Sequence, residues 1–494
     1  MRFEEFKELS ENYNVIPVYR EFIADMSTPV SALAGLMGED NIFLFESVEN
    51  SERFGRYSFI GLNPRGIFTV EKGVPYYSDA SGKRELASPE GAFMALRGLI
   101  KDVKAPELPG LPPLFGGAVG FMGYETVNQF EVLPDPKGEL DTPESAFMLT
   151  DEMVIFDNQR HTMFVIACVR PAEFSGLFEA YNYGLSRIES IRVRLAGSGN
   201  PPSQPVKHTR CRLRPEIDRE AFMEKVEKAR DYIHAGEVIQ LVLSQKFTAE
   251  LTVPELDLYR ALRLVNPSPY TFYMKLGGQT LIGSSPETLI KLDHGVATLR
   301  PIAGTRMRGV DKAADHLLSD ELLSDEKERA EHLMLVDLGR NDLGRVALPG
   351  SVQLKEFMTV ERYSHVMHLV STIEALPDAG IDAFDLVRAA FPAGTLSGAP
   401  KVRAMELIHE LEDSPRNAYG GAVGYFSYSQ NMDLAITIRT LIIRDGRITV
   451  QAGAGIVFDS DPAKEYEETC NKAAALFQAV KLAADGLEIS GDEK

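Results

Sequence analysis

The chain has 494 residues, of which 44% are apolar and 25% are charged, and its formal net charge is −20 at neutral pH. This length and composition are typical of a globular protein with two or three domains. The acidic balance argues against nucleic acid as a partner, because phosphates bind to basic surfaces, but a local anion site remains compatible with it. The three cysteines are widely spaced, which fits a reducing cytoplasm. Neither a signal peptide nor a membrane span is expected, because no long apolar run is found.

The first part of the chain is predicted to be rich in strands. Short apolar runs between turns predict strands at 42–45, 57–60, 67–70, 116–124, 147–156 and 162–169. Residues 105–114 are rich in proline and predict a loop, and an amphipathic pattern predicts a helix at 171–196. The Gly-, Ser- and Pro-rich run 197–205 predicts a linker. We therefore expect an N-terminal domain at 1–205 and a second domain at 206–494.

The second part of the chain mixes helices with hairpin-like strands. Apolar periodicity predicts helices at 218–235, 312–336, 380–390 and 400–412, and strands at 238–247, 421–428 and 434–443, with hairpin-like runs over 270–310. This order favours a layered α+β domain over repeated βαβ units. The runs 116–121 and 420–425 resemble each other. They are either two glycine-rich strands whose neighbours approach closely or strands with related roles in two packed domains.

Two pairs of glutamates are spaced for a common helix face. Glu465 and Glu468 precede Lys472, and a second pair is formed by Glu328 and Glu331. Two such pairs can hold a hard cation such as Mg²⁺, which prefers oxygen ligands, and the lysine indicates an anion beside it. The alternative for each pair is a solvated helix face. If the pairs converge, they predict a metal-dependent reaction on a small carboxylate substrate.

Other motifs admit both a functional and a structural interpretation. Gly304 and Thr305 could offer a backbone N–H and a hydroxyl to a carboxylate, or form an ordinary turn. Arg439, on the inner side of the predicted strand 434–443, could bind a carboxylate in a fork or form an internal salt bridge. His368 lies among apolar residues, where a histidine is usually structural. The run 394–401 lacks the Gly-Lys-Ser/Thr ending of a phosphate loop, so nucleotide binding is rejected.

In combination, these segments resemble the chorismate-utilising enzymes. The resemblance covers the second half of the chain through residues 300–306, 336–342, 365–371, 391–406, 420–425 and 451–472. In the first half, residues 44–49 and 55–61 resemble the anthranilate-forming branch of that family. The resemblance implies an α+β, layered α/β/β/α chorismate-binding fold with two packed, mainly antiparallel sheets and an N-terminal α/β regulatory region.

The resemblance also implies roles for individual residues. Glu331 and Glu468 would hold Mg²⁺, with Glu328 and Glu465 close by. Glu287 would be the general acid that protonates the departing ring hydroxyl, for which burial must raise its pKa. His368 would act in the second half-reaction, in which pyruvate leaves. The substrate would be bound by Gly304, Thr305, Tyr419, Arg439, Gly453, Ala454, Gly455 and Lys472.

Two positions separate the branches of the family. Relatives that add water carry a lysine where this chain has Gln240, and an amide cannot serve as that base. Aminodeoxychorismate synthases typically carry a lysine, able to trap the substrate covalently, where this chain has Ala303. Both positions favour conversion of chorismate and ammonia to anthranilate and pyruvate, the first committed step of tryptophan biosynthesis. Aminodeoxychorismate synthase component I is the alternative.

Partners are implied as well. No segment resembles a glutaminase, so ammonia would come from a separate glutamine amidotransferase subunit, component II, in a heterotetramer of two plus two. The resemblance further implies a feedback site for L-tryptophan between the two domains. Within this feedback site, Thr271 stands where some relatives have methionine. The effector residues would be Glu46, Ser47, Asn266, Pro267, Ser268, Pro269, Tyr270, Val423 and Tyr425.

Overall fold

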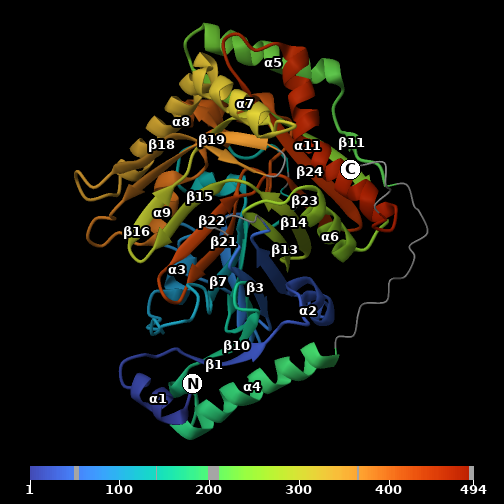
Figure 1. The fold of residues 1–494 in the computed structure, drawn as a ribbon. Helices are drawn as coiled ribbons and strands as arrows, with labels where there is room; N and C mark the ends of the chain where they lie inside the picture. Colours follow the sequence, from blue (N-terminus) through green and yellow to red (C-terminus); the bar gives the residue numbers. More distant parts are fainter. Residues whose placement is uncertain (49–54, 139, 141, 198–210, 364–365, 489–494) are drawn as a thin grey trace.

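Two large antiparallel sheets form the centre of the molecule (Figure 1). The structure, a computed structural model, describes residues 1–48, 55–138, 140, 142–197, 211–363 and 366–488. The first sheet contains, in spatial order, β1 (Ile16–Ile23), β10 (Thr162–Val169), β9 (Glu152–Asp157), β3 (Tyr57–Leu62), β2 (Ile42–Glu46), β13 (Tyr270–Leu276), β14 (Gln279–Ser285), β23 (Thr440–Arg444), β24 (Arg447–Ile456), β12 (Gln240–Glu250) and β11 (Arg214–Pro215), while β20 (Gly398–Ala399) also pairs with β12.

The second sheet is of the same size. Its strands are, in spatial order, β17 (Ile302–Met307), β19 (Val366–Ala375), β16 (Val296–Leu299), β15 (Thr288–Asp293), β22 (Met432–Ile436), β21 (Ala422–Ser427), β7 (Gly117–Met122), β8 (Ser145–Thr150), β4 (Gly66–Glu71), β5 (Val74–Asp79) and β6 (Gly82–Glu85), while β18 (Gln353–Arg362) also pairs with β19.

Helices cover the outer faces of both sheets. Those on the first sheet are α1 (Phe3–Leu9), α2 (Pro29–Leu36), α4 (Leu177–Gly197), α5 (Arg219–His234), α6 (Glu255–Val265), α10 (Lys401–Leu411) and α11 (Pro462–Ala484). Those on the second sheet are α3 (Ala95–Ile100), α7 (Lys312–Ser324), α8 (Glu326–Gly344) and α9 (Ala383–Ala390). Three short 3₁₀ helices lie in connecting segments of the described chain: η1 (Tyr124–Gln129), η2 (Pro171–Glu173) and η3 (Gly394–Leu396). None of the described helices is long and apolar enough to cross a membrane.

Separate apolar cores confirm the predicted α/β/β/α layers. Leu44 and Leu476 belong to the core between the first sheet and its helices. Phe43 and Phe121 belong to the core between the two sheets. Neighbouring residues of β2 therefore point to opposite sides of the first sheet, as the alternation of a strand requires. Burial of both faces explains why these strands are apolar throughout.

The two resembling runs form a hydrogen-bonded pair. β7 and β21 lie side by side and antiparallel, with Gly120 opposite Gly424 in the register. A Cβ atom on Gly120 would lie 2.0 Å from a carbonyl oxygen of β8, and one on Gly424 would lie 2.0 Å from a carbonyl oxygen of β22. The glycines are needed because the backbones approach so closely. The pair also joins the first half of the chain to the second, as β2 and β13 do in the first sheet.

Several predicted elements differ from the elements of the structure. Two predicted strands are each divided where the chain passes from one sheet to the other. The predicted strand 147–156 is β8 followed by β9, and the predicted strand 434–443 is β22 followed by β23. Arg439 causes the second break, since its φ of 49° lies in the left-handed region. The predicted helix 312–336 is α7 followed by α8, because Asp325 caps the second helix through the N–H groups of Lys327 and Glu328. The long helix predicted from residue 171 begins at Leu177.

The domain boundary remains a prediction. Residues 198–205 of the predicted linker lie outside the described residues. The strands on either side of it share both sheets.

Candidate active site

The candidate catalytic residues converge where two crossovers between the sheets run side by side. Glu287 lies between β14 and β15, and Arg439 lies between β22 and β23. The N–H of Ser284 donates to the carbonyl of Arg439 at 3.2 Å, and the N–H of Ile436 donates to the carbonyl of Glu287 at 3.0 Å. These bonds hold the two connections together. An acid and a guanidinium are thereby placed between the sheets.

Glu287 has the properties that a general acid requires. Its side chain is buried, and burial raises its pKa to about 8, an effect that the Thr395 hydroxyl and the charges of Lys472 and Arg439 oppose only in part. The Thr395 hydroxyl donates to the Glu287 carboxylate at 3.2 Å. At neutral pH the carboxyl group is therefore mostly protonated and able to give up a proton.

β17 and β19 bring three of the predicted residues together. Gly304 has a φ of 66°, which bends β17 at a register shift opposite β19. The His368 Nδ1 atom lies 3.0 Å from the carbonyl oxygen of Gly304 and 3.1 Å from the hydroxyl of Thr305. Burial lowers the pKa of His368, so the ring is neutral at pH 7. If Nδ1–H donates to the Gly304 carbonyl, Nε2 is left as a hydrogen-bond acceptor.

β24 and β12 form the opposite side of the site. The ammonium of Lys472 on α11 donates to the carbonyl of Gly453 at 3.0 Å. A Cβ atom on Gly453 would lie 2.7 Å from the Tyr419 hydroxyl, and one on Gly455 would lie 2.5 Å from Nε2 of Gln240. The tyrosine and the amide thus lie directly against the glycine-rich strand. The Oε1 atom of Gln240 is buried without a hydrogen-bond partner, which leaves it available to a ligand.

The four predicted metal-binding carboxylates lie on two facing helices. Burial and the charges of Glu328 and Glu468 raise the pKa of Glu331, although the charge of Lys472 opposes them. Burial also raises the pKa of Glu465, whose Oε2 atom is buried without a partner. The ammonium of Lys327 on α8 lies 3.7 Å from Asp459, just before α11, so the helices that carry the two pairs come close together here.

These carboxylates fit a hard cation in chemistry, and two of them are paired with cations of the chain. Arg306 binds Glu328 at 3.1 Å, and Lys472 binds Glu468 at 2.7 Å. Within the described part of the chain, no three His, Cys, Asp or Glu side chains are arranged to hold a metal ion. The repulsion among the carboxylates and the unpaired oxygen of Glu465 are what a divalent cation would relieve.

The predicted effector residues cluster at the junction of β2 with β13. Among the described residues the buried Ser47 hydroxyl has no hydrogen-bond partner, and the N–H of Val48 donates to the carbonyl of Ser268 at 3.2 Å. The Tyr270 hydroxyl donates to Asp433 at 2.9 Å. Val423 and Tyr425 belong to the core between the sheets, and the ring centroids of Tyr425 and Phe59 are 6.5 Å apart.

Glu46 and Asn266 are held by other groups in this cluster. Glu46 accepts hydrogen bonds from Tyr259 and, at 3.0 Å, from Arg263, both on α6. Its carboxylate therefore points to the outer face of the first sheet. The side chain of Asn266 donates to the carbonyl of Ser284 at 3.2 Å. Both residues can fix the shape of the region, and direct contact of Glu46 with an effector stays a prediction.

Thr395 and a pocket beside Glu287 were not predicted from the sequence. Thr395 lies in the run 394–401, which gave no sign of a functional hydroxyl once nucleotide binding was rejected. The pocket has a volume of about 50 Å³, and among the described residues Glu287 is the only predicted site residue that borders it. Its other walls come from β15, β16, α8 and η3, through residues that include Leu299, Arg300, Leu338, Asp342 and Thr395. Small molecules can therefore approach Glu287 from a side that the predicted substrate residues do not occupy.

Fold and site together define a class of protein. A family model described as chorismate binding enzyme matches residues 41–478, and the chain belongs to that family. The chain is 43% identical to anthranilate synthase component 1 of Acetivibrio thermocellus over 491 residues, which cover 98% of each chain. It is 44% identical to anthranilate synthase component 1 of Pseudomonas putida over 498 residues, which cover 98% of this chain and 99% of the relative.

Solved structures agree with this assignment. The crystal structure of anthranilate synthase component I from Streptococcus pneumoniae TIGR4 superposes with a TM-score of 0.77 at 38% identity, covering 86% of this chain and 92% of that chain. The menaquinone-specific isochorismate synthase MenF from Escherichia coli superposes with a TM-score of 0.71 at 19% identity, covering 97% of this chain and 98% of that chain. The second likeness shows the shared fold.

Proposed function

We propose that the chain is the chorismate-converting subunit of an anthranilate synthase. It would convert chorismate and ammonia to anthranilate and pyruvate. The observation that carries this proposal is that the candidate site holds a buried Glu287, whose raised pKa keeps it protonated, together with an amide, Gln240, that lies against Gly455. The acid can protonate a leaving ring hydroxyl, while the amide cannot deprotonate water. Ammonia, which needs no activating base, is the nucleophile that fits this arrangement, and the names of the relatives support it.

The chain's own residues can perform the remaining steps. Arg439 and Tyr419 would bind the enolpyruvyl carboxylate of chorismate, while Lys472 and the 304–305 turn would flank the ring. Glu287 gives its proton to the departing hydroxyl. Neutral His368 then offers Nε2 as the acceptor for the ring proton that is lost when pyruvate leaves. Thr305 and the Gly304 carbonyl orient this imidazole through Nδ1.

Mg²⁺ is the proposed cofactor. Glu331 and Glu468 would be ligands, with Glu328 and Glu465 close to the ion. When bound, the ion would neutralise the ring carboxylate and draw electron density from the diene as a Lewis acid.

Ammonia and feedback control extend the proposal beyond the single chain. A separate glutamine amidotransferase subunit would supply ammonia, with two copies of each subunit in the assembly. L-Tryptophan would bind near Ser47, between β2, the 266–270 loop and β21. The unpartnered Ser47 hydroxyl supports this placement, because a buried hydroxyl without a partner is costly unless a ligand engages it.

A fluorescence assay tests the proposed reaction. The purified chain is incubated with chorismate and ammonium, with and without Mg²⁺, and anthranilate is followed by its fluorescence. We expect Mg²⁺-dependent formation of anthranilate with release of pyruvate. Chromatography of the same reaction detects an amino-substituted product that keeps its enolpyruvyl group. Accumulation of that product alone would instead identify an aminodeoxychorismate synthase.

A further inference from the structure

Arg416 is the largest side chain that is almost completely buried, with 2% exposed. It follows α10 and precedes β21. Its guanidinium donates to both carboxylate oxygens of Glu412 at 2.8 and 2.7 Å. It also donates to the carbonyl of Leu396 at 2.6 Å and to that of Val242 at 2.7 Å. Since two of its bonds reach backbone carbonyls of distant segments, the side chain fixes the distance between those segments as well as balancing a charge.

Both segments carry residues of the candidate active site. Val242 lies on β12, two residues after Gln240. Leu396 follows Thr395, whose hydroxyl is bonded to Glu287. The guanidinium carbon also lies 5.8 Å from the centre of the Tyr419 ring. The buried guanidinium of Arg416 therefore contacts the strand that carries Gln240, the segment that binds Glu287, and the ring of Tyr419.

Glu412 extends the same support to the glycine-rich strand. Its carboxylate accepts the N–H of Ser244 at 2.8 Å and the hydroxyl of Ser244 at 2.7 Å. Ser244 stands opposite Gly453 in the pairing of β12 with β24. The carbonyl of Gly453 in turn binds Lys472. The ion pair of Arg416 with Glu412 is thus connected, through β12, to the glycine-rich strand β24 and to Lys472.

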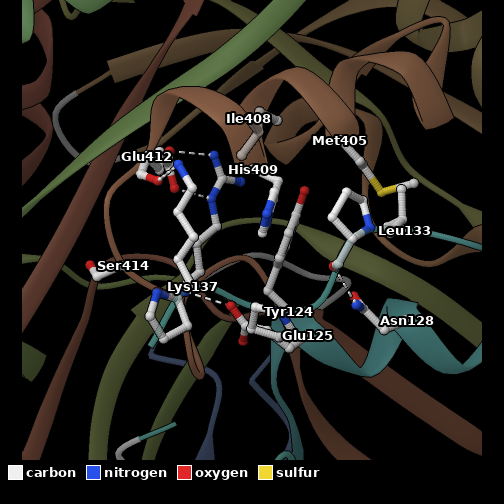
Figure 2. A pocket seen from close by; sticks show the side chains of 14 residues that line it. Tyr124, Glu125, Asn128, Leu133, Lys137, Met405, Ile408, His409, Glu412 and Ser414 are labelled. Atoms are coloured by element: carbon white, nitrogen blue, oxygen red, sulfur yellow. Dashed lines mark hydrogen bonds and ion pairs between the residues drawn. The ribbon is translucent and has the colours of Figure 1, made fainter. Parts of the chain in front are cut away.

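The N-terminal half supports this ion pair through η1. Glu125 accepts the backbone N–H of Arg416 at 2.5 Å, and the Tyr124 ring lies 4.6 Å from the guanidinium carbon. Tyr124, Glu125 and Glu412 line a pocket of about 50 Å³ behind the ion pair (Figure 2). Arg416 therefore forms part of the wall between this pocket and the candidate active site.

We infer that Arg416, held by Glu412, is the positioning residue that sets Tyr419, β12 and the Thr395–Glu287 contact at their working separation. This inference rests on the proposed function. Replacement of Arg416 leaves the carbonyls of Val242 and Leu396 and the Glu412 carboxylate without their partner, so these groups must move toward water or toward each other. Residues that bind substrate then lose their spacing although none of them has been changed.

The matched control is Arg170. It is half-buried, binds Asp151 at 2.5 Å and the Tyr428 hydroxyl at 3.1 Å, and connects the two halves of the chain. Among the described residues, neither Asp151 nor Tyr428 lies in a segment that carries a predicted active-site residue. Arg416→Met and Arg170→Met should therefore lower the melting temperature in a similar way. Only the first should raise the KM for chorismate.

Steady-state kinetics at a temperature where each variant is folded separates the two roles. We expect Arg416→Met to raise KM and to lower kcat/KM by about tenfold or more, as loss of an orienting partner typically does, with partial recovery in Arg416→Lys. Arg170→Met should keep the wild-type KM, because a loss of folded protein lowers the apparent kcat alone. An unchanged KM in Arg416→Met overturns the inference. If that variant does not fold, Glu412→Gln is measured against the same criterion.

Two further measurements make the result independent of the proposed reaction. Hydrogen exchange of residues 240–246 and 393–399 should be faster in Arg416→Met than in Arg170→Met, and equal exchange would contradict the inference even if the chain made no anthranilate. In Arg416→Ala, added guanidinium can enter from the adjoining pocket. It should restore KM in a saturable manner at low millimolar concentration, whereas Arg170→Ala should gain nothing. Absence of rescue together with an unchanged KM rejects the positioning role.

Discussion

The protonation state of Glu287 follows from its place at a crossover between the sheets. Water cannot solvate the carboxylate there, and the one hydroxyl that binds it, from Thr395, offsets only part of the cost of burial. Arg439 and Lys472 act on it from the substrate side. The same burial that makes the residue unfavourable for folding makes it a useful acid at neutral pH.

Glu287→Gln should abolish acid catalysis while preserving the fold. Loss of a positioned general acid typically costs about 10²–10⁴-fold in rate, so ammonia-dependent anthranilate formation should fall by that order. In the wild type, the rate of the first step should decline as pH rises through about 8, where Glu287 loses its proton. Anthranilate fluorescence, measured across a range of pH, checks both the loss of rate in the variant and the decline in the wild type. A variant with more than a tenth of the wild-type rate would contradict the assignment.

Glu287→Gln, which should lower the rate, should increase the stability of the folded protein at alkaline pH. The folded-state pKa of Glu287 is raised above that of an unfolded glutamate, so the folded protein binds a proton more tightly between about pH 4.5 and 8. The stability of the wild type therefore falls with rising pH across this window. Denaturant unfolding at pH 5 and pH 8 should show that Glu287→Gln gains stability relative to the wild type at pH 8.

His368 should act after the first step. Burial keeps the imidazole neutral, which suits a proton acceptor in the loss of pyruvate. In His368→Ala we expect chorismate to be consumed while anthranilate is scarcely released, so that an amino-substituted intermediate accumulates and is visible by chromatography. If chorismate consumption stops as well, the histidine serves binding or the first step.

At the residue scale, the sequence predicted groups whose chemistry is evident from their type and spacing. Glu287, His368 and Lys472 belong to this set. Thr395 and Arg416 escaped prediction for a physical reason. Their importance depends on which distant carbonyl or carboxylate they reach, and no local periodicity encodes such a contact.

At the scale of elements, apolar alternation located most strands but not the points where strands change sheet. Residues 434–443 alternate as one strand would, and only the φ of Arg439 shows that β22 and β23 belong to different sheets. This changes the interpretation of Arg439, which was expected on the face of a strand and instead lies in a connection. Both crossovers that bear candidate catalytic groups end up adjacent, which a one-dimensional pattern cannot indicate.

Helices α8 and α11 carry a prediction of their own. Glu331→Gln and Glu468→Gln should each remove one anionic ligand and abolish Mg²⁺-dependent turnover at low millimolar Mg²⁺. The control is Glu467→Gln on the same helix, since Glu467 is exposed and binds Arg219 at 3.1 Å. Turnover is measured during titration with Mg²⁺. Near-normal activity in both test variants would refute the metal site.

At the scale of the whole molecule, the halves of the chain are interleaved rather than stacked. β2 continues the first sheet into β13, and β7 continues the second into β21. A shift of the N-terminal strands must therefore be passed to strands that end near the active site. Sequence resemblance predicted the layers correctly, whereas the sharing of both sheets depends on pairings between residues hundreds of positions apart.

This continuity gives the proposed feedback site a route to the active site. Ser47 directly follows β2, and the 266–270 loop leads directly into β13 and from there, through β14, to Glu287. An effector that contacts Ser47, Ser268 and Tyr425 would touch both sheets. It can change activity only through a difference in its affinity for two arrangements of those sheets.

L-Tryptophan should therefore inhibit the wild type, and Ser47→Arg should remove the inhibition while ammonia-dependent activity survives. An arginine at this buried position fills the space that an effector would need. The control is Ser186→Arg, on the exposed face of α4, which should stay sensitive. Because coupling is reciprocal and typically about 1–3 kcal/mol, chorismate with Mg²⁺ should weaken tryptophan binding by the same factor that tryptophan weakens chorismate binding. Calorimetry that finds one tryptophan affinity with and without chorismate would refute a two-state linkage between the two sites.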